Sequence, residues 1–435
     1  MINSLFGKII DIIGHFYERI FHEEVSVDVE KFIKNLSYMG IGTIIASVFG
    51  FSFNILAGRW LGPSEYGSFT LVQSVAMFLY IPMMMGFHAA LVKYNTEKID
   101  FLRQRSIIST TFIIITLFTL VSLVIYFIFS KQIMNIFSIS KEIFYFAVVF
   151  AVLFVFYTLM TETMRSLHRL KEYSLFNPIF SIILFFSFLA FIFVFKDPSF
   201  KSPLFSMLLA YGITGGILLA FLRKYIRPEF NWQWAKKLQS FTRYSLISVI
   251  SFVFYTNFGK IVINMYLPVS NLGIYWAYNY SFTAIIFLFY SIFVTVFFPV
   301  ASMCQDKGML YRRVNKIVFL LIIIGWPFAL ISGYILLKMY GTGYPFNLPL
   351  SLLFATAAIC VTVEQLYGQL VCSVGVNGAK IESFATIVLA GVNVILNFLL
   401  IPMLGLAGAI IANIISYLFP IGIMVLKWQD LVNSS

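Results

Sequence analysis

The fold of this chain is decided by residues 56–71, which read LAGRWLGPSEYGSFTL. An apolar helix rich in small residues begins near Tyr38 and ends in this stretch, and a second apolar run restarts at Phe69. Between them, Gly62-Pro63 predicts a sharp turn, because proline cannot continue a helix and biases the residue before it away from the α region. Each flanking run is long enough to cross a bilayer. We therefore expect the tip of a helical hairpin at one membrane face.

The composition is that of a polytopic membrane protein. The chain has 435 residues, 60% of them hydrophobic, with a mean hydropathy of +0.91 and 11% charged residues, against about 25% charged residues in soluble domains. The three cysteines, Cys304, Cys360 and Cys372, have no metal-ligand spacing and predict neither a disulfide nor a metal site. The N-terminus shows no short apolar core followed by a small-residue cleavage site, so no cleaved signal peptide is expected.

Twelve apolar segments are predicted to span the membrane, most of them near the roughly 20 residues that a tilted helix needs. They are residues 36–57, 69–91, 107–129, 143–164, 175–195, 204–222, 244–267, 274–300, 314–337, 348–372, 381–401 and 406–426. Before them, residues 2–22 have apolar positions three or four apart, which predicts an amphipathic helix on the membrane surface. A partner-binding helix is the alternative for that segment.

The distribution of positive charge predicts the orientation of the chain. Alternate loops, counted from the N-terminal tail, collect 23 of the 30 Lys and Arg residues, and the other loops collect six. Cytoplasmic loops carry such an excess. We therefore expect both termini to be cytoplasmic, in the inner or plasma membrane of a prokaryotic cell. The net charge of +12 then needs no nucleic-acid partner.

A weak internal repeat divides the chain into two halves. A shift of 206 residues places Leu61 on Leu267 and Gly67 on Gly273, so that the opening hairpin recurs as YLPVSNLGIYWAY at residues 266–278. We expect an all-α fold of two six-helix bundles that form parallel repeats about an axis along the membrane normal. The predicted divisions are residues 1–34 (interfacial helix), 35–222 (first bundle), 223–243 (basic cytoplasmic linker), 244–426 (second bundle) and 427–435 (cytoplasmic tail).

Polar side chains within spans are costly in lipid and therefore indicate function. Lys260 and Glu364 are the clearest, and Glu364 is a candidate site for a coupling proton or sodium ion. The repeat sets Asn54 opposite Lys260. The repeat also places the hairpins after spans one and seven in corresponding positions, which predicts a cleft near the midplane lined chiefly by spans one, two, seven and eight. The candidate substrate-binding residues are Lys260, Asn54, Arg59, Gln73, Asn257 and Asn279.

A structural reading competes with the functional one for most of these groups. Amides between helices often serve only packing, and charged groups near span ends, such as His88, Lys93, Glu162 and Arg165, can extend to the interface or pair locally. The aromatic run at residues 275–280 suits an interfacial belt or a sugar site.

No catalytic constellation is visible, and no cofactor is expected. The carboxylates are not paired on one face, no glycine loop resembles a phosphate cradle, and the four histidines are scattered. A duplicated helical bundle is instead typical of an alternating-access transporter.

Two stretches resemble the prokaryotic polysaccharide-export flippases, which move lipid-linked oligosaccharides and belong to the multidrug/oligosaccharidyl-lipid/polysaccharide exporter superfamily. The first is R-W-L-G-P-x-E-Y-G-x-F at residues 59–69, and the second is NVILNFLLIPMLGLAGAIIANIISYLF at residues 393–419. In the second, asparagines precede an apolar run to Ile401-Pro402, a tight turn and a small-residue helix. The resemblance covers about residues 35–426.

The resemblance implies export of an oligosaccharide, linked to a polyprenyl phosphate or pyrophosphate, from the cytoplasmic to the outer leaflet. Its implied partners are that substrate, membrane lipids, a coupling cation (H⁺ or Na⁺) and glycan-assembly enzymes. Two alternatives remain open at this point. One is a cation-coupled antiporter of organic cations and drugs from the same superfamily, and the other is a membrane scaffold without transport.

Overall fold

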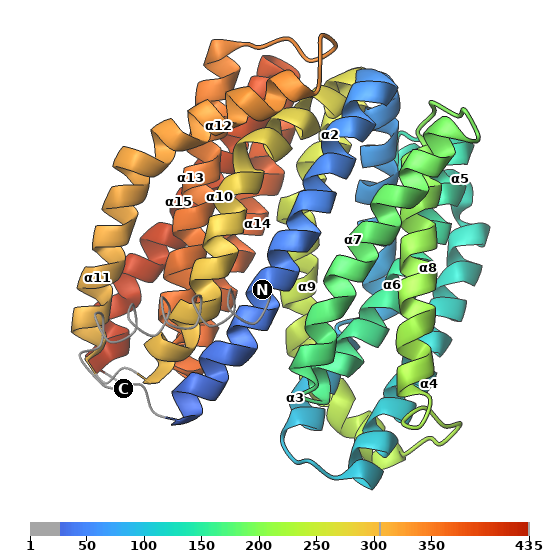
Figure 1. The fold of residues 1–435 in the computed structure, drawn as a ribbon, viewed down its shortest axis with the longest axis vertical. Helices are drawn as coiled ribbons and strands as arrows, with labels where there is room; N and C mark the ends of the chain where they lie inside the picture. Colours follow the sequence, from blue (N-terminus) through green and yellow to red (C-terminus); the bar gives the residue numbers. More distant parts are fainter. Residues whose placement is uncertain (1–26, 304–305, 434–435) are drawn as a thin grey trace, which may run out of the picture.

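The computed structural model describes residues 27–303 and 306–433, and in these ranges the chain is helical and contains no strand (Figure 1). The amphipathic segment predicted at residues 2–22 lies outside the described residues. The helices are α2 (Val27–Met84), α3 (Phe87–Thr96), α4 (Phe101–Ile128), α5 (Ser130–Phe137), α6 (Lys141–Ser166), α7 (Leu170–Phe193), α8 (Lys201–Leu222), α9 (Trp232–Tyr266), α10 (Val269–Met303), α11 (Lys307–Leu320), the π-helical turn η1 (Leu321–Gly325), α12 (Trp326–Met339), α13 (Leu348–Cys372), α14 (Val376–Leu404) and α15 (Leu406–Asn433).

The helix α2 contains the predicted hairpin. Its backbone leaves helical geometry at Gly62, where φ is 75° and ψ is 173°, a conformation open to glycine because it has no Cβ. The apolar part of α2, Gly42–Met84, has 43 residues. That is about 65 Å of α-helix, twice the hydrocarbon core of about 30 Å. Eleven described helices are long and apolar enough to cross a membrane, and because α2 supplies two spans they account for the twelve predicted.

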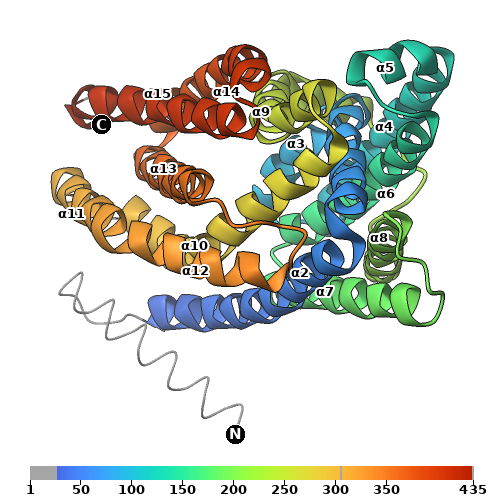
Figure 2. The ribbon, with the colours of Figure 1, turned by 90° about the horizontal axis from the view of Figure 1, so that it is seen from above.

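Two six-helix bundles make up the molecule, as the repeat predicts. In the first, α2 packs against α6 and α7, and α8 packs against both of these helices. In the second, α14 packs against α9 and α15, while α10 and α15 pack against α13. Figure 2 shows the cyan and green helices of the first bundle apart from the orange and red helices of the second. The bundles meet where α2 packs against α9 and α10, and where α3 packs against α9.

The two ends of the bundle differ in what they carry. We call the end that holds the turn at Gly62 and the connection at residues 340–347 the hairpin end. The opposite end, which holds residues 223–231 and the start of α14, is the linker end. Figure 1 shows these at the top and bottom of the view.

The predicted linker is shorter than expected. Residues 223–243 were expected to form a loop, but α9 begins at Trp232 and runs without interruption to Tyr266. Asn231 starts the helix, because its side-chain oxygen accepts the backbone N–H groups of Gln233 (3.0 Å) and Trp234 (3.1 Å). The first turns of α9 thus belong to the basic segment, and residues 223–231 form the non-helical part of the connection.

The outer surface of the bundles is apolar. On α4, for example, Leu117 is 60% exposed and Ile128 is 66% exposed. An apolar surface that is exposed over whole helices is the surface that membrane lipids cover.

Candidate functional site

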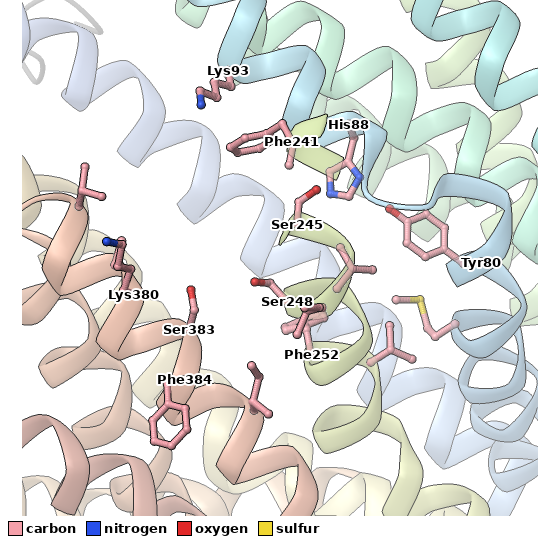
Figure 3. Close-up of a pocket in the computed structure, with 18 of the residues that line it drawn as sticks. Tyr80, His88, Lys93, Phe241, Ser245, Ser248, Phe252, Lys380, Ser383 and Phe384 are labelled. Carbon is pink, nitrogen blue, oxygen red and sulfur yellow. The ribbon is translucent and has the colours of Figure 1, made fainter. Parts of the chain in front are cut away.

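A cavity of about 1010 Å³ lies between the two bundles toward the linker end (Figure 3). From the first bundle it is lined by the end of α2, by α3 and by Phe154 of α6. From the second bundle it is lined by α9 and α14. The lining residues are Met77, Tyr80, His88, Ala89, Lys93, Phe154, Phe241, Ser245, Ile247, Ser248, Val249, Phe252, Val253, Val376, Ala379, Lys380, Ser383, Phe384 and Ile387.

The helices that line this cavity differ in part from those we expected. Span two (the second part of α2 with α3) and span seven (α9) contribute, as predicted. Among the described residues, spans one and eight contribute none, while span eleven (α14) forms one wall. The prediction of spans one and eight was wrong for this cavity, because α2 and α10 pack against each other and close the space between them.

A break in span two shapes the wall next to α9. Helix α2 ends at Met84 and α3 begins at Phe87, with φ of 49° at Met85 and 80° at Gly86. The hydroxyl of Ser245 on α9 donates to the carbonyl oxygen of Gly86 at 3.1 Å. A Cβ on Gly86 would lie 2.7 Å from that hydroxyl oxygen. Glycine is therefore required twice, for its left-handed backbone and for the close approach of α9.

The break places two basic side chains of α3 on the cavity wall. His88 lies between Tyr80 and Ser245 (Figure 3), and its Nδ1 is buried with no hydrogen-bond partner among the described residues. The Lys93 ammonium lies 4.4 Å from the ring centroid of Phe241, a cation–π contact that holds it at the mouth of the cavity.

The charge of the cavity is positive. Lys380 on α14 lies on the opposite wall from Lys93 (Figure 3), and both lysines are exposed at the linker end. Three serines, Ser245, Ser248 and Ser383, supply hydroxyl groups. The described lining contains no Asp or Glu. Two cations, a histidine and the hydroxyl groups of Ser248 and Ser383 suit an anionic ligand with polar groups around it, whereas the Ser245 hydroxyl already donates to Gly86.

A smaller polar pocket of about 310 Å³ adjoins this cavity within the second bundle. It contains Glu364 of α13 and Glu382 of α14, and its described lining includes no Lys, Arg or His. Glu382 accepts a hydrogen bond from the Thr386 hydroxyl at 3.0 Å. Ser248 and Phe252 of α9 line both spaces, so the carboxylate pocket and the basic cavity share one wall.

Most of the substrate-binding candidates lie nearer the hairpin end. The Lys260 ammonium donates to the side-chain oxygen of Asn257 at 3.2 Å and lies 4.2 Å from the ring centroid of Trp276. Asn54 accepts a hydrogen bond from the Tyr66 hydroxyl at 3.2 Å. The structure therefore brings Lys260 and Asn257 together, on the same helix as the wall of the cavity but outside its lining.

The remaining candidates are dispersed. Arg59 is exposed at the hairpin end, 3.5 Å from the carbonyl oxygen of Met339. The Gln73 amide nitrogen lies 3.1 Å from the sulfur of Met207, inside the first bundle. Asn279 is half-buried on α10. None of the three lines the cavity.

The hairpin end is closed by packed tyrosines. Tyr66 and Tyr340 are fully buried against each other, with ring centroids 6.0 Å apart. The Tyr344 hydroxyl donates to the carbonyl oxygen of Gly58 at 2.9 Å, and the Tyr278 hydroxyl donates to that of Pro345 at 2.6 Å. These contacts close the hairpin end, whereas Lys93 and Lys380 of the cavity lining are exposed at the linker end.

Sequence reasoning did not select the basic residues that line the cavity. The sequence places His88 and Lys93 near the end of span two, where extension to the interface or local pairing is the competing interpretation, and Lys380 among the charges of a loop. The available signal was Gly86 within the second span, because an isolated glycine in an apolar helix often has a structural reason. Lys93 and Lys380 line the same cavity because of how the bundles pack, so no local sequence pattern predicts that they do.

Comparisons with known proteins agree with this architecture. A family model described as "Polysaccharide biosynthesis protein" matches residues 32–305, more than half of the chain. The chain is 23% identical over 398 residues to the probable low-salt glycan biosynthesis flippase Agl15 of Haloferax volcanii, a match that covers 88% of this chain and 81% of that protein.

Solved structures share the fold at low sequence identity. The lipid II flippase MurJ in an inward closed conformation has a TM-score of 0.67 at 13% identity, covering 90% of this chain and 87% of that one. An inward-facing multidrug resistance transporter of the MATE family has a TM-score of 0.68 at 14% identity, covering 90% and 96%. An outward-facing structure with a similar title has a TM-score of 0.59, covering 92% and 96% at 13% identity. The chain therefore belongs to the polysaccharide biosynthesis protein family, the polysaccharide and oligosaccharide flippases that its sequence resembles.

Proposed function

We propose that the protein moves an oligosaccharide, linked to a polyprenyl phosphate or pyrophosphate, from the cytoplasmic to the outer leaflet by alternating access. The observation that carries the proposal is the basic, serine-lined cavity between the bundles, open at the linker end and closed at the hairpin end. Similarity to a probable glycan biosynthesis flippase supports the substrate class.

The charge of the two ends supports this direction of transport, because it indicates how the molecule is oriented in the membrane. The linker end holds the Lys- and Arg-rich loops, and such loops stay in the cytoplasm. In the described state the cavity is therefore accessible from the cytoplasmic leaflet, where the substrate would enter.

The chemistry of the cavity fits a phosphate-bearing headgroup. Lys93 and Lys380 would contact phosphate oxygens from opposite walls, and charge-assisted hydrogen bonds are the strong ones. The serine hydroxyls and the rings of Phe241 and Phe252 offer the polar and flat surfaces that sugars use. The polyprenyl chain would stay in the bilayer.

The absence of carboxylates from the described cavity lining disfavours an organic-cation antiporter, because a cationic drug would meet two lysines without a counter-charge. The carboxylates lie instead in the smaller pocket. There we assign Glu364, with Glu382, as the site of a coupling cation, H⁺ or Na⁺. The shared wall at Ser248 and Phe252 would let occupancy of this site act on the substrate cavity.

Substitution of the two lysines tests the proposed function. Loss of one charge-assisted contact costs about 1.5–3 kcal/mol, so we expect Lys93→Gln and Lys380→Gln each to reduce transport of a short-chain polyprenyl pyrophosphate-linked sugar in proteoliposomes by about tenfold or more. Lys224→Gln, an exposed lysine outside the cavity lining, is the matched control. Normal transport by the double variant, at equal protein level, would exclude the cavity as the substrate site.

A further inference from the structure

Two glycines that the repeat aligns touch each other across the two bundles. Gly67 of α2 and Gly273 of α10 are 206 positions apart. A Cβ on Gly67 would overlap the carbonyl oxygen of Val269 and lie 3.0 Å from the backbone nitrogen of Gly273. A Cβ on Gly273 would overlap the carbonyl oxygen of Pro63 and lie 3.0 Å from the backbone nitrogen of Gly67.

The contact is symmetric. Pro63 and Val269, which supply the two carbonyl oxygens, are also 206 positions apart. Each bundle therefore presents the same carbonyl and the same glycine to the other, as a twofold interface requires. The two halves of the contact are equivalent, so they form and break together.

The crossing lies where the hairpin end is sealed. Gly67 follows Tyr66, which is fully buried against Tyr340, and Gly273 lies two residues before the aromatic run at residues 275–280. The turn at Gly62 and the start of α10 at Val269 stand beside it.

We propose that the crossing of Gly67 and Gly273 is the latch of the hairpin end: the two backbones meet directly when this end is closed and separate as a unit when it opens. The inference rests on the alternating access of the proposed function, but it requires no particular substrate. At the crossing itself backbone meets backbone, so this contact can break and form again without repacking of side chains between the two glycines. Contacts of Cα–H groups with carbonyl oxygens hold the closed form.

Alanine at either glycine tests the latch. The added methyl group overlaps a carbonyl oxygen, which is backbone and cannot rotate away, so Gly67→Ala and Gly273→Ala should each favour the state that is open at the hairpin end. We expect that state to rise from a minor population, about 10% or less, to the major one.

The populations can be measured as distances between spin labels, without any glycan. In a background with the three native cysteines replaced by serine, one pair of labels is attached through Ser64→Cys and Ser270→Cys at the hairpin end. A second pair, through Lys98→Cys and Asn377→Cys, reports on the linker end. Each alanine variant should lengthen the first distance and shorten the second.

The control is Gly50→Ala, also on α2, where a Cβ would meet nothing within 4 Å. It should leave both distances unchanged. If folded Gly67→Ala and Gly273→Ala proteins keep the unsubstituted distances, the latch is disproved, whereas the flippase proposal stands.

A second experiment keeps both glycines, in case the alanine variants fail to fold. A short thiol cross-linker between Ser64→Cys and Ser270→Cys should hold the hairpin end shut and stop transport, and cleavage of the linker should restore it. Undiminished transport by the cross-linked protein would also overturn the latch.

Discussion

Lys260 contacts an amide oxygen and an aromatic ring, two neighbours that a phosphate group could replace. The amide of Asn257 accepts its hydrogen bond, and the ring of Trp276 covers its charge. Such a cation–π contact contributes about 0.5–2 kcal/mol, less than a charge-assisted contact to phosphate. We therefore expect phosphate to displace Trp276 when the hairpin end opens.

This role predicts different results from two substitutions. Lys260→Gln removes the charge and should abolish glycan export, while Lys260→Arg should keep part of it, both at unchanged protein levels. Lys131→Gln, an exposed lysine of α5, is the control for charge at the hairpin end. Normal export by Lys260→Gln would reduce Lys260 to a residue that only packs against Trp276.

Glu364 is the residue whose charge should connect transport to an ion gradient. It is 8% exposed, and no basic residue appears in the described lining of its pocket. Glu364→Gln cannot bind or release the cation, so the transport rate should lose its dependence on an imposed proton or sodium gradient. The measurement uses proteoliposomes, with Glu142→Gln as control, because Glu142 pairs with Lys201 away from this pocket. A gradient dependence that survives in Glu364→Gln would contradict the assignment.

At the scale of elements, the break between α2 and α3 has the largest effect on the shape of the cavity wall. An unbroken second span would continue in the direction of α2, whereas the left-handed residues Met85 and Gly86 turn the chain and set Lys93 against Phe241. The hydrogen bond from Ser245 to Gly86 fixes the break to α9.

Substitution of Gly86 should therefore destabilise the protein. Gly86→Ala combines an unfavourable backbone conformation, which costs about 1–3 kcal/mol, with a clash against Ser245. Thermal unfolding of the purified protein should show a lower midpoint than the parent. Gly212→Ala on α8 is the matched control, because a Cβ there would meet nothing within 4 Å, and its midpoint should be equal or higher. Equal midpoints for both variants would mean that the break tolerates alanine.

At the scale of the whole molecule, the charge of the ends predicts the orientation in the membrane. Ser64 at the hairpin end and Ser240 at the start of α9 are both exposed. With the native cysteines removed, a membrane-impermeant thiol reagent should label Ser64→Cys, but not Ser240→Cys, in intact cells. The reverse pattern would overturn the topology and with it the direction of transport.

The hairpin at Gly62, the twelve spans and the division into two bundles could all be predicted from the sequence. These features are local, or repeat at a fixed interval. A span must satisfy its own backbone hydrogen bonds in lipid, so its length and its apolar composition are visible in one segment. The turn at Gly62-Pro63 likewise depends on two adjacent residues. The repeat is visible because two segments of the same sequence match at a fixed interval.

The tertiary structure alone decided which side chains meet. Lys93 and Lys380 come from different bundles, so their position in one cavity depends on how the bundles pack; Glu364 and Glu382 come from different helices of the second bundle, so their position in one pocket depends on how these helices pack. The helix break at Gly86 is similar, since it depends on the contact with Ser245 of α9. The length and apolar composition of the chain's segments determine how many helices cross the membrane. The rotation of each helix about its axis is set by its packed neighbours. That rotation determines which residues line a cavity.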